Sequence, residues 1–187
     1  DNQVDNDKTL KLMSKISLSY ADSGADMVAP SSMMDGLVLS IRNNLNINGF
    51  RDTKIMSFSK QFSCLYSPFR LTAFKKFSKI DKSTYQIGYS NSREMLRKIE
   101  LDLREGADII TIKPSLGNLD LICRIVDRVS CKIAVQHVSG EYEMLMAATR
   151  NRLIEEHEWI IGYFTSMIRA GVNLIISYGA EEIAALI

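Results

Sequence analysis

The chain is poor in the residues that build disulfide and metal sites. Its 187 residues include only three cysteines and two histidines, and the cysteines form no CxxC pair. This spacing predicts reduced thiols in a cytosol-like compartment and no metal site within the chain. The net charge is +1, with both signs interspersed, which argues against a nucleic-acid partner.

The sequence also lacks a long apolar segment. No run of about 18 apolar residues occurs, so we expect no membrane partner. The first seven residues, Asp1 to Asp7, are too acidic for a signal or transit peptide. We therefore predict a cytoplasmic protein, with a plastid as the alternative compartment. Because no methionine begins the chain, we also expect it to be part of a longer protein.

One structural unit recurs along the chain, in which a polar helix ends in glycine and a β-rich strand follows at once. Its three copies contain Gly24, Gly106 and Gly171. Glycine after a helix end supplies a left-handed cap, and the two or three residues before the strand are typical of an αβ loop. With 46% hydrophobic and 24% charged residues, the repeats predict one globular α/β domain.

The apolar patterns predict alternating strands and helices. We expect strands near 26–29, 54–60, 108–113, 132–136 and 174–178. We expect helices at about 8–22, 36–46, 92–105, 119–129, 141–151, 156–170 and from Ala180 onward. Apolar strands that alternate with helices indicate a parallel sheet covered on both sides. An eight-stranded TIM (β/α)8 barrel has about 250 residues, so five strands correspond to about five of its βα units.

Two lysines stand where apolar strands end, Lys60 and Lys113. Pro114 disfavours the helical region for the residue before it, so Lys113 is expected to remain extended at the last position of its strand. Barrel enzymes place their chemistry at this end of the strands. The ordinary alternative for either lysine alone is a solvated strand terminus.

A pair of such lysines has a specific chemical consequence. Two ammonium groups about 4 Å apart repel by roughly 4 kcal/mol at an effective dielectric constant near 20. This repulsion corresponds to about three pKa units, which would bring the pKa of one lysine from about 10.4 towards 7. An amine of that pKa attacks ketones to form a Schiff base.

A long segment without predicted regular structure covers residues 59–91. Loops beyond about 15 residues in a compact domain are usually functional lids or disordered segments. Because this one begins at Lys60, we predict an active-site lid, with a solvated insertion as the alternative.

Several sequence blocks carry a family resemblance. They include Asp26-Met-Val-Ala-Pro-Ser-Ser-Met-Met-Asp-Gly36, Glu105-Gly-Ala-Asp-Ile-Ile-Thr-Ile-Lys-Pro114 and Val138-Ser-Gly-Glu141, with shorter blocks at 55–60, 66–70, 85–86 and 119–120. In this order and spacing they resemble the porphobilinogen synthases, also called delta-aminolevulinic acid dehydratases. The resemblance spans 1–187 and implies the C-terminal portion of that family's TIM barrel.

The resemblance implies that a further N-terminal portion lies outside this chain. It would hold the first strands, the arm that builds a homo-octamer, and the cysteine or aspartate cluster that binds zinc or magnesium. It also implies a hydro-lyase that condenses two 5-aminolevulinate molecules into porphobilinogen, an early step of tetrapyrrole and haem synthesis.

The family's site residues carry over position by position. Lys113 matches the lysine that forms a Schiff base with the first substrate, and Lys60 matches the neighbour that lowers its pKa and binds the second substrate. Ser139 and Tyr178 match the hydroxyls that bind the first carboxylate. The remaining matches are Arg70, Lys82 and Gln86, which stand at lid positions for the second carboxylate, and Ser31, which lies in the block beneath the site.

Some positions depart from the family pattern. They are Ser32 for an aspartate, Leu37 for an arginine, Lys82 for the second lid arginine, Gln136 for a tyrosine, Asn118 for an aromatic residue and Lys98 for a glutamate of the allosteric metal site. A lysine is a point charge where arginine makes a two-pronged contact to a carboxylate. These departures leave two alternatives open: an inactive fragment or pseudoenzyme of the family, and another Schiff-base barrel enzyme such as a class I aldolase.

Overall fold

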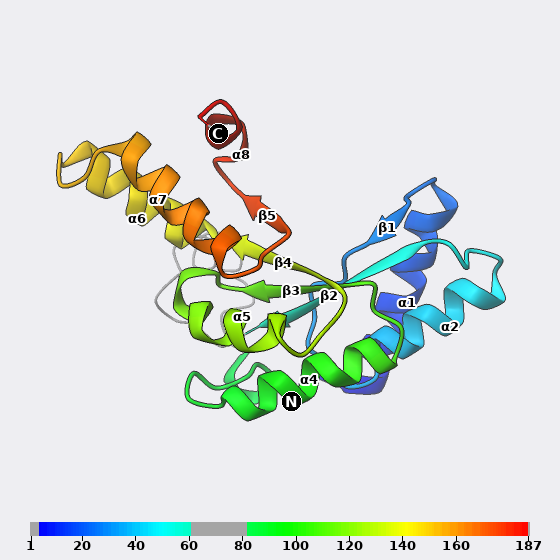
Figure 1. The fold of residues 1–187 in the computed structure, drawn as a ribbon. Coiled ribbons are helices and arrows are strands. Elements are labelled where there is room, and N and C mark those ends of the chain that lie inside the picture. Colours follow the sequence, from blue (N-terminus) through cyan, green and yellow to red (C-terminus); the bar gives the residue numbers. More distant parts are fainter. Residues whose placement is uncertain (1–3, 61–81, 187) are drawn as a thin grey trace. The chain divides into compact units, whose positions relative to one another are not determined.

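The computed structural model describes residues 4–60 and 82–186 of the chain, with the side chain of Lys60 left out (Figure 1). The chain divides into two compact units, one with the described residues up to Thr111 and one with those from Ile112 onward. We call them the N-terminal unit and the C-terminal unit. The five strands follow one another in the sheet in the order of the chain, β1-β2-β3-β4-β5. This order confirms the predicted α/β class.

The N-terminal unit contains two helices that pack on each other and a third that covers a strand. Its elements are α1 (Asn6–Asp22), β1 (Met27–Val28), α2 (Leu37–Ile47), β2 (Lys54–Lys60), the short 3-10 helix η2 (Lys82–Thr84), α4 (Ser92–Arg104) and the start of β3 (Ile109–Lys113). Strands β1 and β2 pair in parallel, with Met27 opposite Lys54. The N–H of Asp108 donates to the carbonyl of Ile55 at 2.9 Å, which places β3 beside β2.

The core of this unit lies between α1, α2 and the first two strands. Its buried members are Ala21, Val28, Met34, Leu37, Val38, Ile41, Leu45 and Ile55. The hydroxyls of Ser14 and Ser40 lie 2.7 Å apart across the two helices, and the Asn44 amide donates to the Ser14 carbonyl at 2.9 Å. The apolar side chains that predicted α1 and α2 therefore form the contact between these helices, and the serine and asparagine side chains add hydrogen bonds to it.

Arg42 connects three segments of the N-terminal unit. Its guanidinium donates to the carbonyl of Thr53 at 2.9 Å, to that of Gly106 at 3.1 Å and to the carboxylate of Asp108 at 2.7 Å. The same carboxylate accepts from the N–H of Ile55 at 2.9 Å. One arginine on α2 thus fixes where β2 and β3 begin.

Helix α4 is fixed at its start by a cap and along its length by β2. The Asn91 side chain accepts from the N–H of Glu94 at 3.1 Å, which confirms the predicted helix start. The buried Asp102 accepts from the hydroxyl of Ser57 at 2.5 Å and pairs with Lys98. Because Ser57 belongs to β2, this network anchors α4 to the strand that ends at Lys60.

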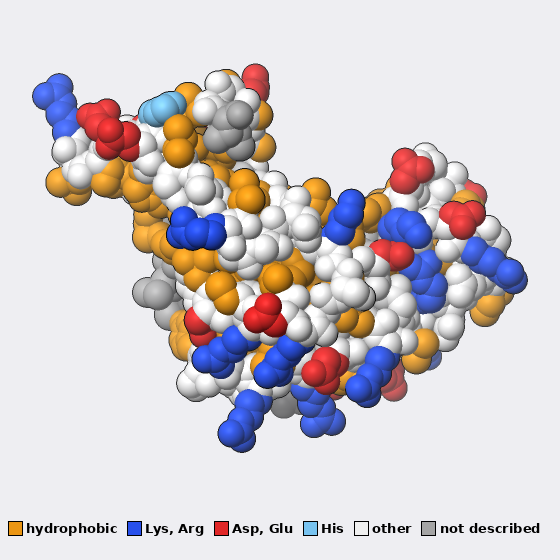
Figure 2. All heavy atoms as spheres, viewed as in Figure 1, with side chains coloured by type: hydrophobic (Ala, Val, Ile, Leu, Met, Phe, Trp, Pro, Cys, Tyr) orange, Lys and Arg blue, Asp and Glu red, His pale blue; other side chains and the backbone are white. Residues whose placement is uncertain are grey.

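The C-terminal unit packs its helices around the end of β3 and two further strands. Its elements are the 3-10 helix η3 (Leu116–Asn118), α5 (Leu119–Val126), β4 (Lys132–His137), α6 (Ser139–Arg150), α7 (Glu156–Arg169), β5 (Leu174–Ser177) and α8 (Ala180–Ala184). Strands β4 and β5 are parallel, with His137 opposite Ser177. Figure 2 shows hydrophobic side chains that reach the surface over α6 and α7. Exposed ones in this unit include Met144, Leu153, Ile168 and, on β5, Leu174 and Ile176.

The glycine caps predicted from the sequence are present. Gly24, Gly106 and Gly171 have φ values of 94°, 102° and 98°, in the left-handed region that favours glycine. At Gly171 a Cβ would also lie 2.7 Å from the methyl groups of Val126, so only glycine fits against α5.

Several boundaries differ from the sequence prediction, since α1 begins at Asn6 and not at Lys8, and α5 ends at Val126 and not at Val129. Helix α6 begins at Ser139 and not at Glu141, because the Glu141 side chain reaches back to the N–H of Val138 at 2.7 Å and stabilises an earlier start. The segment expected to be irregular over 59–91 begins with the last two residues of β2 and contains η2, while 61–81 lie outside the described residues. Its role as a lid stays a prediction.

Candidate active site

Lys113 occupies the last position of β3, where the sequence predicted it. The preceding strand residues Ile109 to Ile112 are buried, whereas Lys113 itself is half-buried. Strand β3 therefore leaves the buried core at its last residue, Lys113, which is the residue of this strand with a side-chain amine. The following peptide bond, Lys113–Pro114, is cis.

The segment after Lys113 is held by side chains from its own turn and from α6 and α7. The amide of Asn118 donates to the carbonyl of Pro114 at 2.6 Å. The hydroxyl of Ser115 lies 3.0 and 3.1 Å from the two carboxylate oxygens of Glu141 and 2.5 Å from the hydroxyl of Tyr163. Asn118, a departure from the family pattern, thus has a structural role in the turn that follows the lysine.

Two further predicted residues stand at the ends of neighbouring strands. Ser139 is the first residue of α6, directly beyond β4, and Tyr178 directly follows β5 with 53% of its surface exposed. Strands β4 and β5 are parallel, and their last residues, His137 and Ser177, are paired. Ser139 and Tyr178 therefore both lie at the carboxyl ends of these strands. Ser139 also stands at a helix N-terminus, whose N–H groups favour an anionic ligand.

His137 lies beneath this edge and is completely buried. Its Nδ1 is 3.0 Å from the hydroxyl of Ser177, and its ring lies 5.0 Å from that of Tyr163 and 5.7 Å from that of Phe164. Burial among aromatic rings lowers the pKa of His137 to about 4. A neutral, buried imidazole agrees with the structural role that the sequence suggested for this histidine.

The predicted residues of the N-terminal unit come from β2 and from the segments beside it. Lys60 is the last residue of β2, Ser31 follows β1, and Lys82 begins η2. Gln86 is half-buried, and its Oε1 atom is buried with no hydrogen-bond partner among the described residues. Arg70 lies outside the described residues. The predicted pairing of Lys60 with Lys113 and the predicted substrate roles remain predictions.

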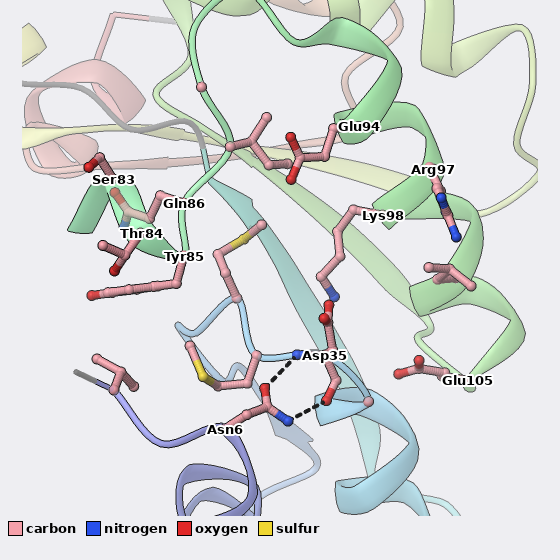
Figure 3. Close-up of a pocket in the computed structure, with 17 residues that line it drawn as sticks. Asn6, Asp35, Ser83, Thr84, Tyr85, Gln86, Glu94, Arg97, Lys98 and Glu105 are labelled. Atoms are coloured by element: carbon pink, nitrogen blue, oxygen red, sulfur yellow. Dashed lines mark hydrogen bonds between the residues drawn. The ribbon is translucent and has the colours of Figure 1, made fainter. Parts of the chain in front are cut away.

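Figure 3 shows a pocket of about 800 Å3 within the N-terminal unit. Its wall combines the start of α4, with Glu94, Arg97 and Lys98, and the segment that contains Gln86. Asn6 holds the loop below by accepting from the N–H of Asp35 at 3.0 Å and donating to its carbonyl at 3.3 Å. Of the predicted site residues, Gln86 is the one that lines this pocket.

Glu141 and Asp102 are the residues that sequence reasoning missed. Glu141 entered the sequence analysis only as part of a family block and as the expected start of a helix, and Asp102 did not enter it. Both carboxylates are buried, at 2% and 0% exposure, and each accepts a serine hydroxyl close to a strand-end lysine. A signal was available for Glu141, because a glutamate at the third position of a helix commonly reaches back to the helix start.

The metal expected for the family is not assigned to this part of the chain. Among residues 4–60 and 82–186, no three His, Cys, Asp or Glu side chains are grouped so that they could hold an ion. Cys123 is a free thiol. The described residues therefore do not fit a zinc or magnesium site, and we assign no chemical step to a metal. None of the described helices is both long and apolar enough to span a membrane.

Comparisons with known proteins identify the family. The family model described as delta-aminolevulinic acid dehydratase matches residues 1–186. The chain is 47% identical over 185 residues to the delta-aminolevulinic acid dehydratase of Archaeoglobus fulgidus, covering 98% of this chain and 57% of that protein. It is 45% identical to that of Synechococcus elongatus, covering 97% of this chain and 56% of that protein.

A solved structure gives the same result for the fold. The delta-aminolevulinic acid dehydratase (porphobilinogen synthase) of Toxoplasma gondii, in complex with the reaction product porphobilinogen, matches with a TM-score of 0.93 and 40% identity. The match covers 98% of this chain and 53% of that one. The fold predicted from the sequence, about five βα units of a TIM barrel, is therefore confirmed. The chain spans little more than half the length of the relatives that it matches.

Proposed function

Because the chain belongs to the delta-aminolevulinic acid dehydratase family, we propose that it provides the Schiff-base half of a porphobilinogen synthase site. The reaction joins two 5-aminolevulinate molecules and releases two molecules of water as porphobilinogen forms. The observation that carries this proposal is Lys113, a half-buried lysine at the last position of a buried strand. Active sites of TIM barrels lie at this end of the strands.

Lys113 is the proposed nucleophile. Its neutral amine attacks the ketone carbon of the first 5-aminolevulinate, and loss of water leaves an imine between the lysine nitrogen and that carbon. The protonated imine withdraws electrons, so the carbon beside it can lose a proton and form a carbon–carbon bond. The imine carbon itself can accept an amine and form a carbon–nitrogen bond as the lysine nitrogen leaves. The structure supports this role, because the rest of β3 is buried and only its last residue is partly exposed.

Ser139 and Tyr178 are the proposed partners of the first substrate's carboxylate. They stand beyond the paired strands β4 and β5, at the same edge of the sheet. A carboxylate that accepts hydrogen bonds there fixes the register of the ketone relative to Lys113. Such positioning converts an encounter between two molecules into a reaction within one complex.

The second substrate is assigned to residues of the N-terminal unit and of the lid. We propose that Lys60 lowers the pKa of Lys113 by charge repulsion and forms a second Schiff base. Arg70, Lys82 and Gln86 would hold the second carboxylate, with Ser31 beneath the site. Lys82 gives a weaker, single-point contact than arginine, which predicts looser binding of this substrate.

We propose that porphobilinogen formation needs parts that this chain does not supply. Its relatives are nearly twice as long, and we propose that an additional portion provides the remaining strands, a metal site for zinc or magnesium and the arm of a homo-octamer. A cytoplasmic or plastid location stays a prediction.

The test is formation of porphobilinogen from 5-aminolevulinate by the naturally occurring protein, detected by colour with Ehrlich reagent. Colour that is lost in Lys113→Met and kept in Lys132→Met supports the proposal, because Lys132 is an exposed lysine at the opposite end of a strand. No colour from the unsubstituted protein would favour a pseudoenzyme, for which Ser32 and Leu37 are the candidate causes. Schiff-base trapping of other ketones, but not of 5-aminolevulinate, would favour an aldolase-like enzyme.

A further inference from the structure

Glu141 is a buried carboxylate that joins two segments of the C-terminal unit. It is 2% exposed and lies in the first turn of α6. One of its oxygens accepts from the N–H of Leu116 at 2.6 Å, and the other accepts from the N–H of Val138 at 2.7 Å. Ser115 adds its N–H at 3.3 Å and its hydroxyl at 3.0 Å from Oε2.

These donors flank the two groups assigned to the first substrate. Ser115 and Leu116 follow Lys113 by two and three positions, and Val138 directly precedes Ser139. One side chain therefore bonds to the turn after the proposed nucleophile and to the turn before the proposed carboxylate ligand. Both turns and Glu141 belong to the C-terminal unit.

The arrangement exceeds what a helix cap requires. A capping glutamate satisfies the N–H at the helix start, which here is the bond to Val138. The bonds to Ser115 and Leu116 contribute nothing to that cap, because both residues belong to the turn after β3. They are also charge-assisted, and such bonds are about twice as strong as those between neutral groups.

The network continues beyond the carboxylate. The hydroxyl of Ser115 lies 2.5 Å from that of Tyr163, which is buried on α7. A buried carboxylate is costly unless donors surround it, so its oxygens hold these donors in place. The turn after Lys113 thus has a defined position relative to α6 and α7.

We propose that Glu141 is a positioning residue for Schiff-base formation, which sets the Lys113 amine and the Ser139 hydroxyl to bind one substrate molecule at the same time. This inference rests on the proposed function. Glu141 does not touch the substrate. Its effect passes through the two turns that it joins.

A positioning role has a consequence that a purely stabilising role does not. The spacing between amine and hydroxyl matters only for a ligand that uses both. 5-Aminolevulinate has a ketone for Lys113 and a carboxylate for Ser139. Aminoacetone has the same aminoketone group but no carboxylate, so its reaction with Lys113 depends on the amine alone.

The experiment compares the two ligands in Glu141→Gln and in the naturally occurring protein. Each is incubated with 5-aminolevulinate or aminoacetone and borohydride below the melting temperature of the variant, and the adduct on the Lys113 peptide is followed by mass spectrometry. We expect the trapping rate with subsaturating 5-aminolevulinate to fall at least tenfold in Glu141→Gln. The rate with aminoacetone should remain within about twofold. Glu143→Gln, an exposed glutamate on the same helix, should change neither rate.

Three results would overturn the inference. Equal losses with both ligands in folded Glu141→Gln would show a structural role, and unchanged rates with both would show no role. Absence of 5-aminolevulinate trapping in the unsubstituted protein would overturn the proposed function, and this inference with it. Failure of the proposed function can be told apart from failure of this inference, because it is seen in the unsubstituted protein without any variant.

A milder variant covers the case in which Glu141→Gln does not fold. Ser115→Ala removes the hydroxyl that bonds to Glu141 and leaves the backbone donors of Leu116 and Val138. It should lower the ratio of 5-aminolevulinate to aminoacetone trapping by about threefold to tenfold. A ratio equal to that of the unsubstituted protein in folded Ser115→Ala would also contradict the positioning role.

Discussion

The hydroxyl of Ser57 donates to the carboxylate of Asp102 at 2.5 Å, on a strand that ends three residues later at Lys60. The carboxylate is completely buried and pairs with Lys98, whose side chain is 11% exposed. A charge network therefore connects α4 to β2. Strand β2 carries Lys60, one of the two proposed amines.

This network predicts a large stability loss when its carboxylate is removed. Asp102→Ala leaves the largely buried Lys98 without this carboxylate partner, which should lower the free energy of unfolding by about 3 to 5 kcal/mol. Urea unfolding of the natural protein measures the loss. Glu100→Ala, at an exposed position of the same helix, is the control and should change the stability by less than about 0.5 kcal/mol. Similar effects of the two substitutions would contradict the account of this network.

A second prediction concerns the amine of Lys113. Borohydride added with 5-aminolevulinate should leave a covalent adduct on the peptide that contains Lys113, because reduction traps the imine. The adduct should disappear in Lys113→Met and persist in Lys132→Met. Peptide mass spectrometry measures the amount of adduct in each of the two variants. An adduct that is unaffected by Lys113→Met would show that Lys113 is not the nucleophile.

Arg70 should act on the second substrate alone. A contact between arginine and a carboxylate is charge-assisted, so Arg70→Ala should cost roughly 2 to 3 kcal/mol of binding for that substrate. Single-turnover Schiff-base formation at Lys113 should survive. Arg93→Ala, an exposed arginine on α4, is the matched control. Equal loss of both steps in Arg70→Ala would show that Arg70 has a structural role.

His137 predicts how stability depends on pH. Its pKa is about 4 in the folded protein because burial disfavours the charged ring, whereas an exposed histidine titrates near 6.5. Unfolding therefore takes up a proton between these values. The stabilising contribution is fully present above pH 6.5 and is lost as the pH falls towards 4, to a total of about 3 kcal/mol.

Urea unfolding at pH 7 and pH 4.5 tests this dependence. His137→Gln removes the titrating ring and should show a smaller loss of stability between the two pH values than the unsubstituted protein. His157→Gln, an exposed histidine on α7, should behave like the unsubstituted protein. An equal pH dependence in all three proteins would show that folding does not lower the pKa of His137.

The edge of β5 predicts self-association of residues 1–187 expressed alone. Leu174, Ile176 and Tyr178 are 40%, 37% and 53% exposed, and five parallel strands do not close a barrel that has eight. Light scattering after gel filtration should show aggregates or loose oligomers that form no porphobilinogen. The double substitution of Leu174 and Ile176 by lysine should increase the monomer fraction, because charged side chains block edge pairing. A monomeric, cooperatively melting and active protein would refute the claim that strands are missing.

The sequence predicted the elements well where local patterns decide them. Glycine at 24, 106 and 171 marked three helix ends, because caps depend on residues within one turn. The strand-end position of Lys113 also followed from local sequence, since Pro114 stops the strand pattern.

Sequence reasoning did not find contacts between distant segments. The bond between Leu116 and Glu141 joins residues 25 positions apart, and the one between Ser57 and Asp102 joins residues 45 apart. Such partners depend on how strands and helices pack, which local propensity does not encode. The start of α6 was placed two residues late for a local reason, since the side chain of Glu141 reaches back to the N–H of Val138 and stabilises that turn.

The bond between Arg42 and Asp108 also bears on how the segment between them can evolve. It closes a loop of 66 residues that includes the whole of 61–81. The entropy of loop closure grows only with the logarithm of loop length, so a dozen inserted residues would change it by about 0.1 kcal/mol. Natural selection is therefore free to lengthen or shorten this segment at almost no thermodynamic penalty to the unit that contains Arg42 and Asp108.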